Sequence, residues 1–293
     1  MYRKTIAKCM TYRYTLNRDV VNLFSPVERL QIVFNMYVRK SYLISWMRHL
    51  SHILATQDAG APHSRTESTP WDGWIGPPIA FPALDALNRD LAAAKPGDMF
   101  FAHLLLPHHP YTVDASCNIK RPIFTSWRES HTHFLIKSHA VTADERKERY
   151  THYIPQVRCA MHRLTELFST LKKAGHYDDA IIIIQGDHGS RLYRNEPIKE
   201  NIPVLTDADF SDSFSSLFAV KMPGVTPGID SVMVDLPGLL KQVQDGVLHS
   251  GQPVKGPTNP VAMIYDATRG SMNKKVMYPL SMPAFPLNSP PGR

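Results

Sequence analysis

A chain of 293 residues can form one large α/β domain or two small ones. With 43% hydrophobic and 20% charged residues, its composition is globular and excludes a wholly disordered chain. The net charge of +7 favours anionic ligands. We expect no nucleic-acid partner, because Lys and Arg form no run interleaved with aromatic residues.

The sequence predicts neither a membrane-spanning segment nor a signal peptide within this chain. No apolar run is long enough to span a bilayer, and the basic N-terminus lacks an apolar signal region. The compartment is left open. Cys9, Cys117 and Cys159 show no metal-binding spacing. One disulfide is an option for an exported domain, but scattered buried cysteines are the favoured interpretation.

The first 81 residues have a mixed pattern of strand, helix and loop signals. Residues 12–16 have the pattern of a short strand. Ser25 and Pro26 then fit the N-cap and first position of a helix, and Glu28 completes a capping box. Apolar residues at helical spacing extend this helix to about Thr56. A core-facing helix is the favoured reading, and a membrane-lying amphipathic helix is the alternative.

A helix over residues 82–94 and a strand over residues 99–106 are predicted next. The strand leads into a segment rich in proline and histidine, with candidate site residues His103, His108 and His109. We expect the region 107–141 to be a long irregular and functional segment.

The next helix and strand repeat this order. A capping box from Thr142 to Glu145 opens a helix that we expect to end at Lys173. Residues 180–185 then read as a strand buried on both faces, followed at once by Asp187 and His188. Repetition of helix, strand and polar loop is typical of a parallel sheet with helical crossovers.

Loops and short elements complete the chain. Residues 192–213 read as a loop, and its acidic residues, Asp207, Asp209 and Asp212, are either extra metal ligands or, as we favour, a solvated cluster. A strand over residues 217–221 and a helix over residues 232–243 follow. Residues 282–293 are expected to be a disordered tail.

The polar residues after the two strands indicate a metal and anion site. Ligands collect beyond the carboxyl ends of parallel strands, so the two loops are expected to face one crevice. Asp187 offers a carboxylate oxygen and His188 an imidazole nitrogen, a mixture that suits zinc or manganese.

Three motifs resemble those of the sulfatase and alkaline-phosphatase superfamily. These are the GDHG turn at residues 186–189, the H-x-x-x-x-H-x-P pattern at residues 103–110, and a late strand that ends in Pro-Gly at residues 223–224. The resemblance spans about residues 82 to 240. It implies an α/β fold with a mostly parallel sheet and helices on both faces. Residues 1–281 would form one domain, with residues 82–243 as its core.

The resemblance also implies an activity and roles for residues. A metal-dependent hydrolase or transferase would act on sulfate or phosphate esters, with an anionic ester as its partner. Asp187 and His188 would bind the divalent metal ion, which is zinc, manganese or calcium. His108 and His103 would be catalytic, and Arg191 and His109 would contact the substrate.

The N-terminal part departs from the family pattern. We find no acidic strand end followed by a Cys, Ser or Thr nucleophile in residues 1–81. The chain therefore looks like the C-terminal two thirds of such an enzyme. The alternative function is a truncated, inactive homologue that binds its metal weakly. A missing strand beside the site would leave an exposed sheet edge, through which we expect self-association.

Overall fold

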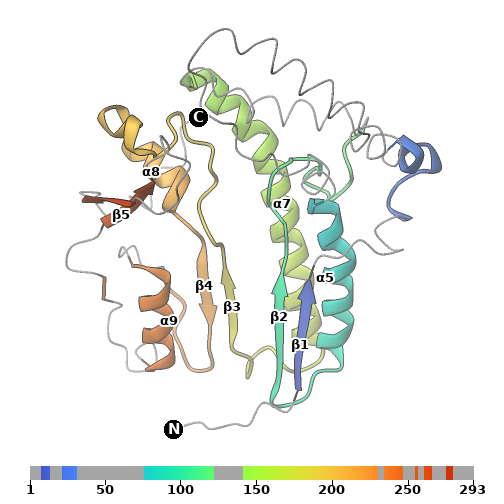
Figure 1. The fold of residues 1–293 in the computed structure, drawn as a ribbon. Helices are drawn as coiled ribbons and strands as arrows, with labels where there is room; N and C mark the ends of the chain where they lie inside the picture. The colour runs from blue at the N-terminus through green and yellow to red at the C-terminus, as the bar shows by residue number, and fades with distance from the viewer. Residues whose placement is uncertain are drawn as a thin grey trace. The chain divides into compact units, whose positions relative to one another are not determined.

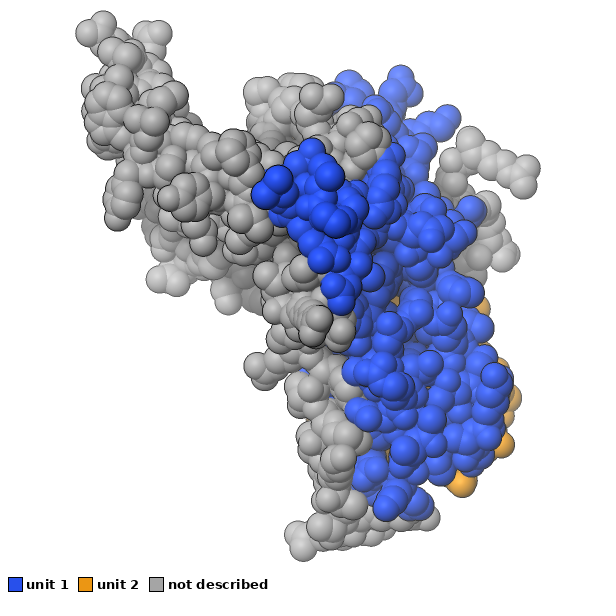
Figure 2. Space-filling view, turned by 90° about the vertical axis from the view of Figure 1, so that its right-hand side faces the viewer, with its two compact units in different colours: residues 1–177 blue, residues 178–293 orange. Residues whose placement is uncertain are grey.

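The computed structural model describes residues 8–13, 22–31, 76–121, 141–229, 234–246, 255–256, 261–265 and 275–279. The chain divides into two compact units, residues 1–177 and residues 178–293, which Figure 2 colours separately. The prediction of a single domain over residues 1–281 stays a prediction. Most of the predicted N-terminal helix and the tail at residues 282–293 lie outside the described residues.

In the first unit, an N-terminal strand lies beside the histidine-bearing strand. β1 (Lys8–Arg13) runs parallel to β2 (Asp98–His103), with Arg13 opposite His103 (Figure 1). The predicted strand at residues 99–106 thus ends at His103, shortly before Pro107, which has no N–H to donate to a ladder. The short strand predicted at residues 12–16 thus lies earlier, at Lys8–Arg13, and it covers one edge of β2.

Helix α5 (Gly76–Ala92) packs against β1, β2 and helix α7. Its buried apolar side chains recur at helical spacing and include Ile79, Leu84, Leu87 and Leu91. The helix begins before the predicted start at Pro82, which lies in its interior. Prolines 77 and 78 fit the first turn, because backbone N–H groups there have no acceptor within the helix.

Helix α7 (Ala143–Lys173) confirms the prediction at both of its ends. At the N-cap, Thr142 Oγ1 accepts from Glu145 N at 3.2 Å, and Glu145 Oε2 accepts from Thr142 N at 2.7 Å. After the last turn, Gly175 takes a positive φ of 73° and its N–H donates to the Lys172 carbonyl at 3.1 Å. Glycine adopts this left-handed conformation without strain, which explains the end of the helix.

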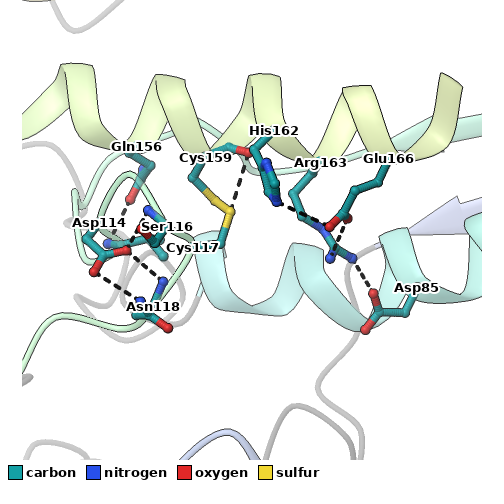
Figure 3. The surroundings of a disulfide bond; sticks show 11 residues. Asp85, Asp114, Ser116, Cys117, Asn118, Gln156, Cys159, His162, Arg163 and Glu166 are labelled. Atoms are coloured by element: carbon teal, nitrogen blue, oxygen red, sulfur yellow. Dashed lines mark hydrogen bonds and ion pairs between the residues drawn. A yellow bond between two sulfur atoms is a disulfide. The ribbon is translucent and has the colours of Figure 1, made fainter. Parts of the chain in front are cut away.

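A segment that we call the histidine loop, residues 104–121, is joined to α7 by the Cys117–Cys159 disulfide (Figure 3). The favoured interpretation of scattered, unpaired cysteines is therefore wrong for this pair. Asp114 closes the turn before Cys117, because its Oδ1 accepts from Ser116 N at 2.9 Å and from Asn118 N at 2.8 Å. The loop is thus irregular but held to the helix by a covalent bond.

The end of the histidine loop is tied to the short helix that begins at Ser25. The predicted capping box is confirmed, with Ser25 N donating to Glu28 Oε2 at 2.8 Å and Glu28 N donating to Ser25 Oγ at 3.3 Å. Arg121 donates to the same carboxylate through Nε at 2.9 Å and Nη2 at 3.1 Å. Such a two-point pair fixes geometry as well as charge.

The second unit holds the strand that precedes the Asp-His turn. β3 (Ile182–Gln185) pairs antiparallel with β4 (Phe218–Lys221), with Ile182 opposite Lys221. The isoleucines alternate along the strand, and Ile183 is 43% exposed, so the prediction of a strand buried on both faces is wrong. An antiparallel pair can leave one face open in this way.

The segment predicted as a loop after the Asp-His turn contains two helical elements. A 3₁₀ turn, η1 (Lys199–Val204), precedes helix α8 (Asp207–Phe214). Asp209 and Asp212 lie buried on α8, so the interpretation of a solvated acidic loop is wrong for both. The sequence contains a signal for the start of this helix, because Thr206 and Asp209 form a capping box there.

Short elements complete the second unit. Helix α9 (Leu236–Gln244) begins after the Asp235 N-cap, later than predicted. β5 (Val261–Tyr265) pairs antiparallel with β6 (Lys275–Pro279), and Ile264 of β5 packs with Phe210 of α8. The architecture is therefore a mixture of helices and strands. Its described strand pairs are one parallel and two antiparallel, which does not confirm a mostly parallel sheet.

The described residues bear on two further predictions. No helix within the described ranges has the length and apolar character needed to cross a bilayer. Self-association through an open sheet edge gains no support from the described residues, since β1 already lies along one edge of β2.

The disulfide generates a stability prediction. Replacing both partners, Cys117→Ala with Cys159→Ala, should lower the free energy of unfolding by about 4 kcal/mol, because the cross-link restricts a long loop of the unfolded chain. Urea unfolding followed by circular dichroism measures the change. Cys9→Ala is the control, since it leaves this disulfide intact. A double variant with the wild-type unfolding midpoint would contradict the assignment.

Candidate functional site

The three candidate histidines of the first unit lie at the end of β2 and in the histidine loop. His103 is the last residue of β2 and is exposed. His108 is exposed, and its Nδ1 lies against the carbonyl oxygen of His109. The ring of His109 packs edge-on against Tyr111, with centroids 5.6 Å apart. The loop thus presents His108 to solvent, while part of His109 is used in packing.

The Asp-His turn follows β3 in the second unit, as predicted. The Asp187 side chain is 84% exposed, and that of His188 is 26% exposed. His188 Nδ1 lies 2.7 Å from the carbonyl oxygen of Gly189. Its Nε2 lies 3.4 Å from Asp187 Oδ1. The two ligand-type side chains are therefore adjacent and point their acceptor atoms at one place.

The ring contacts of His108 and His188 have the same form. In each, Nδ1 meets the carbonyl oxygen of the following residue. A carbonyl accepts but cannot donate, so this contact favours the proton on Nδ1. In that tautomer Nε2 carries the lone pair of each ring, the form in which an imidazole binds a metal or accepts a proton.

The spacing of Asp187 and His188 fits two neighbouring ligands of one metal ion. Ligand atoms about 2.1 Å from a tetrahedral zinc ion are about 3.4 Å apart, which matches the separation of Oδ1 and Nε2. Within the described ranges, however, no group of three or more His, Cys, Asp or Glu side chains is arranged to hold a metal. These residues supply part of a ligand shell, and a tight zinc site uses three or four ligands.

The Asp-His turn is anchored on the C-terminal end of α8. Gly189 N donates to the Ser213 carbonyl at 3.0 Å, and Arg191 N donates to the Asp212 carbonyl at 2.6 Å. Carbonyls in the last turn of a helix lack partners within the helix, so the turn satisfies them. A Cβ on Gly189 would lie 2.4 Å from the Asp212 carbonyl oxygen, which explains why this position needs glycine.

Arg191 takes a left-handed backbone conformation, with φ of 57°. Residues other than glycine rarely adopt it, and such positions cluster at functional sites. The conformation directs the chain from the Asp-His turn into the buried Leu192. Arg191 itself is exposed, which is compatible with contact to an anionic ligand.

Asp209 organises the segment after Arg191 and was not predicted as a structural residue. It is 1% exposed. Its Oδ1 accepts from the backbone N–H groups of Arg194 at 2.8 Å and Asn195 at 3.0 Å. Its Oδ2 accepts from Thr206 N at 3.0 Å and Thr206 Oγ1 at 2.8 Å. Both carboxylate oxygens are therefore occupied by protein donors, which argues against a metal-binding role.

The same contacts determine the charge state of Asp209. Burial alone would raise the pKa of its carboxyl group. The hydrogen bonds from Asn195 and Thr206 outweigh burial and hold the pKa below its ordinary value. Asp209 is therefore a buried, ionised carboxylate at neutral pH.

Asp212 joins the turn to α8 through its side chain as well as its carbonyl. Ser190 Oγ donates to Asp212 Oδ1 at 3.2 Å and accepts from Leu192 N at 3.3 Å. The acidic cluster is thus divided by role: Asp209 and Asp212 hold the structure around the turn, and Asp207 is exposed.

The candidate residues form two groups, each within one unit. His103, His108 and His109 belong to the first unit, and Asp187, His188 and Arg191 belong to the second. The convergence of these two groups on one crevice, and the roles assigned to their members, stay predictions. Within its unit, each group lies at or just after the end of a strand, β2 for the histidines and β3 for the Asp-His turn, as the sequence predicted.

Part of the chain is similar to a known protein family. Residues 82–213, which include β2, the histidine loop and the Asp-His turn, match the family model described as Sulfatase. The predicted resemblance to this family is confirmed over these residues.

Curated relatives with a similar sequence are lipoteichoic acid synthases. The chain is 30% identical over 142 residues to lipoteichoic acid synthase of Staphylococcus aureus strain USA300, and equally to that of strain MRSA252. The match covers 47% of this chain and 19% of each relative, so the matched region is about a fifth of the relatives' length.

Two solved structures from Bacteroides thetaiotaomicron are also similar. One, whose title concerns metabolism of multiple glycosaminoglycans, is 15% identical and has a TM-score of 0.39, with 69% of this chain and 44% of that chain covered. The other, titled as a sulfatase of strain VPI-5482, is 12% identical with a TM-score of 0.40, covering 71% and 53%.

The buried carboxylate of Asp209 generates a prediction about stability and pH. Its folded-state pKa is lowered, so its stabilisation is fully present above the unfolded value of about 4 and is lost as pH falls below it. Asp209→Asn should lower the free energy of unfolding by about 2 to 4 kcal/mol at pH 7, because an amide cannot accept at both ends.

Urea unfolding at pH 7 and at pH 3 measures this effect, and the difference between variant and wild type should shrink at the lower pH. Asp207→Asn is the matched control, because Asp207 is exposed on the same helix. It should change the unfolding free energy by less than about 0.5 kcal/mol. An equal effect of both substitutions would contradict the structural role of Asp209.

Proposed function

We propose that this chain supplies the metal-binding and anion-binding part of a sulfatase-like hydrolase or transferase that acts on sulfate or phosphate esters. The observation that carries the proposal is the Asp187–His188 pair, with acceptor atoms 3.4 Å apart, inside the region that matches the sulfatase family. The substrate is an anionic ester, which suits the net charge of +7.

Asp187 and His188 would hold the divalent ion, which we propose to be zinc, manganese or calcium. When bound, such an ion supplies positive charge opposite the ester oxygens. The chain's own part is to hold the ligands in place. The Gly189 carbonyl orients the His188 ring through Nδ1, and α8 fixes the turn through the carbonyls of Asp212 and Ser213.

The remaining candidates would act on the ester. His108 is exposed, so its imidazole can contact the anion or give a proton to the leaving oxygen. His103 is the second catalytic candidate. Arg191 can pair with an ester oxygen through its planar guanidinium group, and His109 would lie at the rim of the substrate.

One observation favours the alternative, an inactive homologue. The described residues provide two ligands of a metal shell and no third acidic or histidine ligand beside them. The sequence of residues 1–81 also has no acidic strand end followed by a nucleophile. A weakly held ion and a missing nucleophile would leave binding without efficient turnover.

Metal binding provides the first test of the proposal. Titration calorimetry with zinc or manganese should show weak binding to the wild type and none to Asp187→Ala, which removes one of the two proposed ligands. Asp179→Ala is the matched control, because Asp179 is an exposed carboxylate just before β3. Tight stoichiometric binding that survives Asp187→Ala would place the metal elsewhere.

Ester cleavage provides the second test. With nitrophenyl sulfate and nitrophenyl phosphate, and with zinc, manganese or calcium added, we expect the chain to turn over barely above background, because no nucleophile is identified. Any metal-dependent rate should be lost in His188→Ala. A robust rate abolished by His188→Ala would overturn the inactive alternative. A robust rate that survives this substitution would contradict the proposed site.

A further inference from the structure

One face of α7 holds the histidine loop at successive points. Tyr153, Gln156 and Cys159 recur at every third position, so they lie on the same side of the helix. Tyr153 packs edge-on against Tyr111, with ring centroids 5.5 Å apart, and Cys159 forms the disulfide with Cys117. Gln156 lies between these contacts and points from α7 toward the loop (Figure 3).

Gln156 is completely buried and uses both ends of its side-chain amide. Its Nε2 donates to the carbonyl of His108 at 2.6 Å, and its Oε1 accepts from the N–H of Val113 at 3.2 Å. These two bonds enclose residues 108–113 of the histidine loop. A buried amide with both ends satisfied fixes the geometry of its partners, because losing either bond leaves a polar group unpaired.

The chemistry of the two partners selects a neutral amide at this position. The His108 carbonyl needs a donor, and the Val113 N–H needs an acceptor. An ionised Glu supplies two acceptors and no donor, and an apolar side chain supplies neither. The side chain of Gln156 is therefore matched to these two backbone groups, in addition to filling space in the core.

The contact reaches the imidazole of His108 through the backbone. Gln156 holds the carbonyl of His108, and the His108 ring in turn rests with Nδ1 against the next carbonyl, that of His109. Fixing the first peptide group therefore restricts the direction of the imidazole ring. We propose that Gln156 is a positioning residue for His108, an inference that rests on the proposed role of His108 in the ester reaction.

The other contacts of this helix face are less direct. The disulfide attaches at Cys117, beyond the Val113–Ile119 bridge, so it does not hold the His108 peptide itself. The Tyr111–Tyr153 ring contact packs the loop but has no polar partner at His108. Removal of Gln156 should therefore move His108 more than reduction of the disulfide does.

The experiment observes the ring nitrogens of His108 by ¹⁵N NMR in the full chain, with the signals assigned by their loss in His108→Ala. Gln156→Leu removes both hydrogen bonds and nearly preserves volume. Gln156→Glu removes the donor when ionised and restores it when protonated. Leu167→Ala is the matched control, because it creates a cavity at another buried residue of α7, eleven residues after Gln156.

We expect the His108 signals to shift in Gln156→Leu and to keep wild-type positions in Leu167→Ala and after reduction of the disulfide. In Gln156→Glu they should differ from wild type at pH 8 and match wild type at pH 5, since burial raises the pKa of a carboxyl group. This comparison of Gln156→Glu at two pH values tests the inference even if Gln156→Leu does not fold. Wild-type His108 signals in Gln156→Glu at both pH values would overturn the inference.

An activity measurement separates this inference from the proposed function. Where the wild type cleaves nitrophenyl esters, Gln156→Leu should lower kcat by about 10- to 100-fold, as expected for a displaced catalytic group, and leave zinc affinity unchanged. A wild type without cleavage would agree with the inactive alternative and would not bear on Gln156, because the NMR signals by themselves decide whether Gln156 positions His108.

Discussion

Backbone N–H and carbonyl groups need hydrogen-bond partners, and both candidate site loops lack regular secondary structure that would provide them. The protein meets this constraint with groups on neighbouring helices. The side-chain amide of Gln156 on α7 forms hydrogen bonds with backbone groups of the histidine loop. The last carbonyls of α8 accept from backbone N–H groups of the Asp-His turn. The position of each candidate site loop therefore depends on a helix that follows it by many residues in the sequence. Damage to either helix should reach the site through these few bonds.

Buried polar groups also explain the distribution of charge around the Asp-His turn. Asp209 is ionised in the interior because four backbone and hydroxyl donors, together with the Asn195 amide, surround its carboxylate. Asp187, in contrast, is exposed and has only His188 as an ion-pair partner in the described part of the chain. Two acidic residues of the second unit thus have different roles. Asp209 stabilises the segment after the Asp-His turn, and Asp187 is available to a cation.

The two candidate histidines illustrate how a short local contact prepares a side chain for chemistry. In His108 and in His188 the carbonyl of the next residue engages Nδ1. Such a contact at Nδ1 fixes the orientation of each ring and favours a proton on Nδ1, the arrangement that suits a metal ligand or an acid-base group. The family match over residues 82–213 is consistent with such chemistry, and the small share of the relatives that this chain covers leaves their activities as proposals here.

Local patterns were sufficient wherever the determining contacts lie within a few residues. The capping boxes at Ser25 and Thr142, the end of α7 at Gly175, and the polar residues that follow β2 and β3 were all predicted from neighbours in the sequence. The sulfatase resemblance also came from such motifs and is confirmed. The start of α8 belongs to the same group, although its capping box at Thr206 was overlooked.

Contacts between distant residues were decided only by the tertiary structure. Composition and spacing could not pair Cys117 with Cys159, and they could not show that β3 runs antiparallel to β4. They also could not separate the buried Asp209 from the exposed Asp207, since both look alike in an acidic segment. The physical reason is common to all three: hydrogen bonds and burial between segments far apart in the chain leave no periodic signal in either segment. The sequence by itself thus determined the resemblance to the sulfatase family and the candidate site residues, whereas the packing of α7 and α8 decided how the two loops that carry them are held.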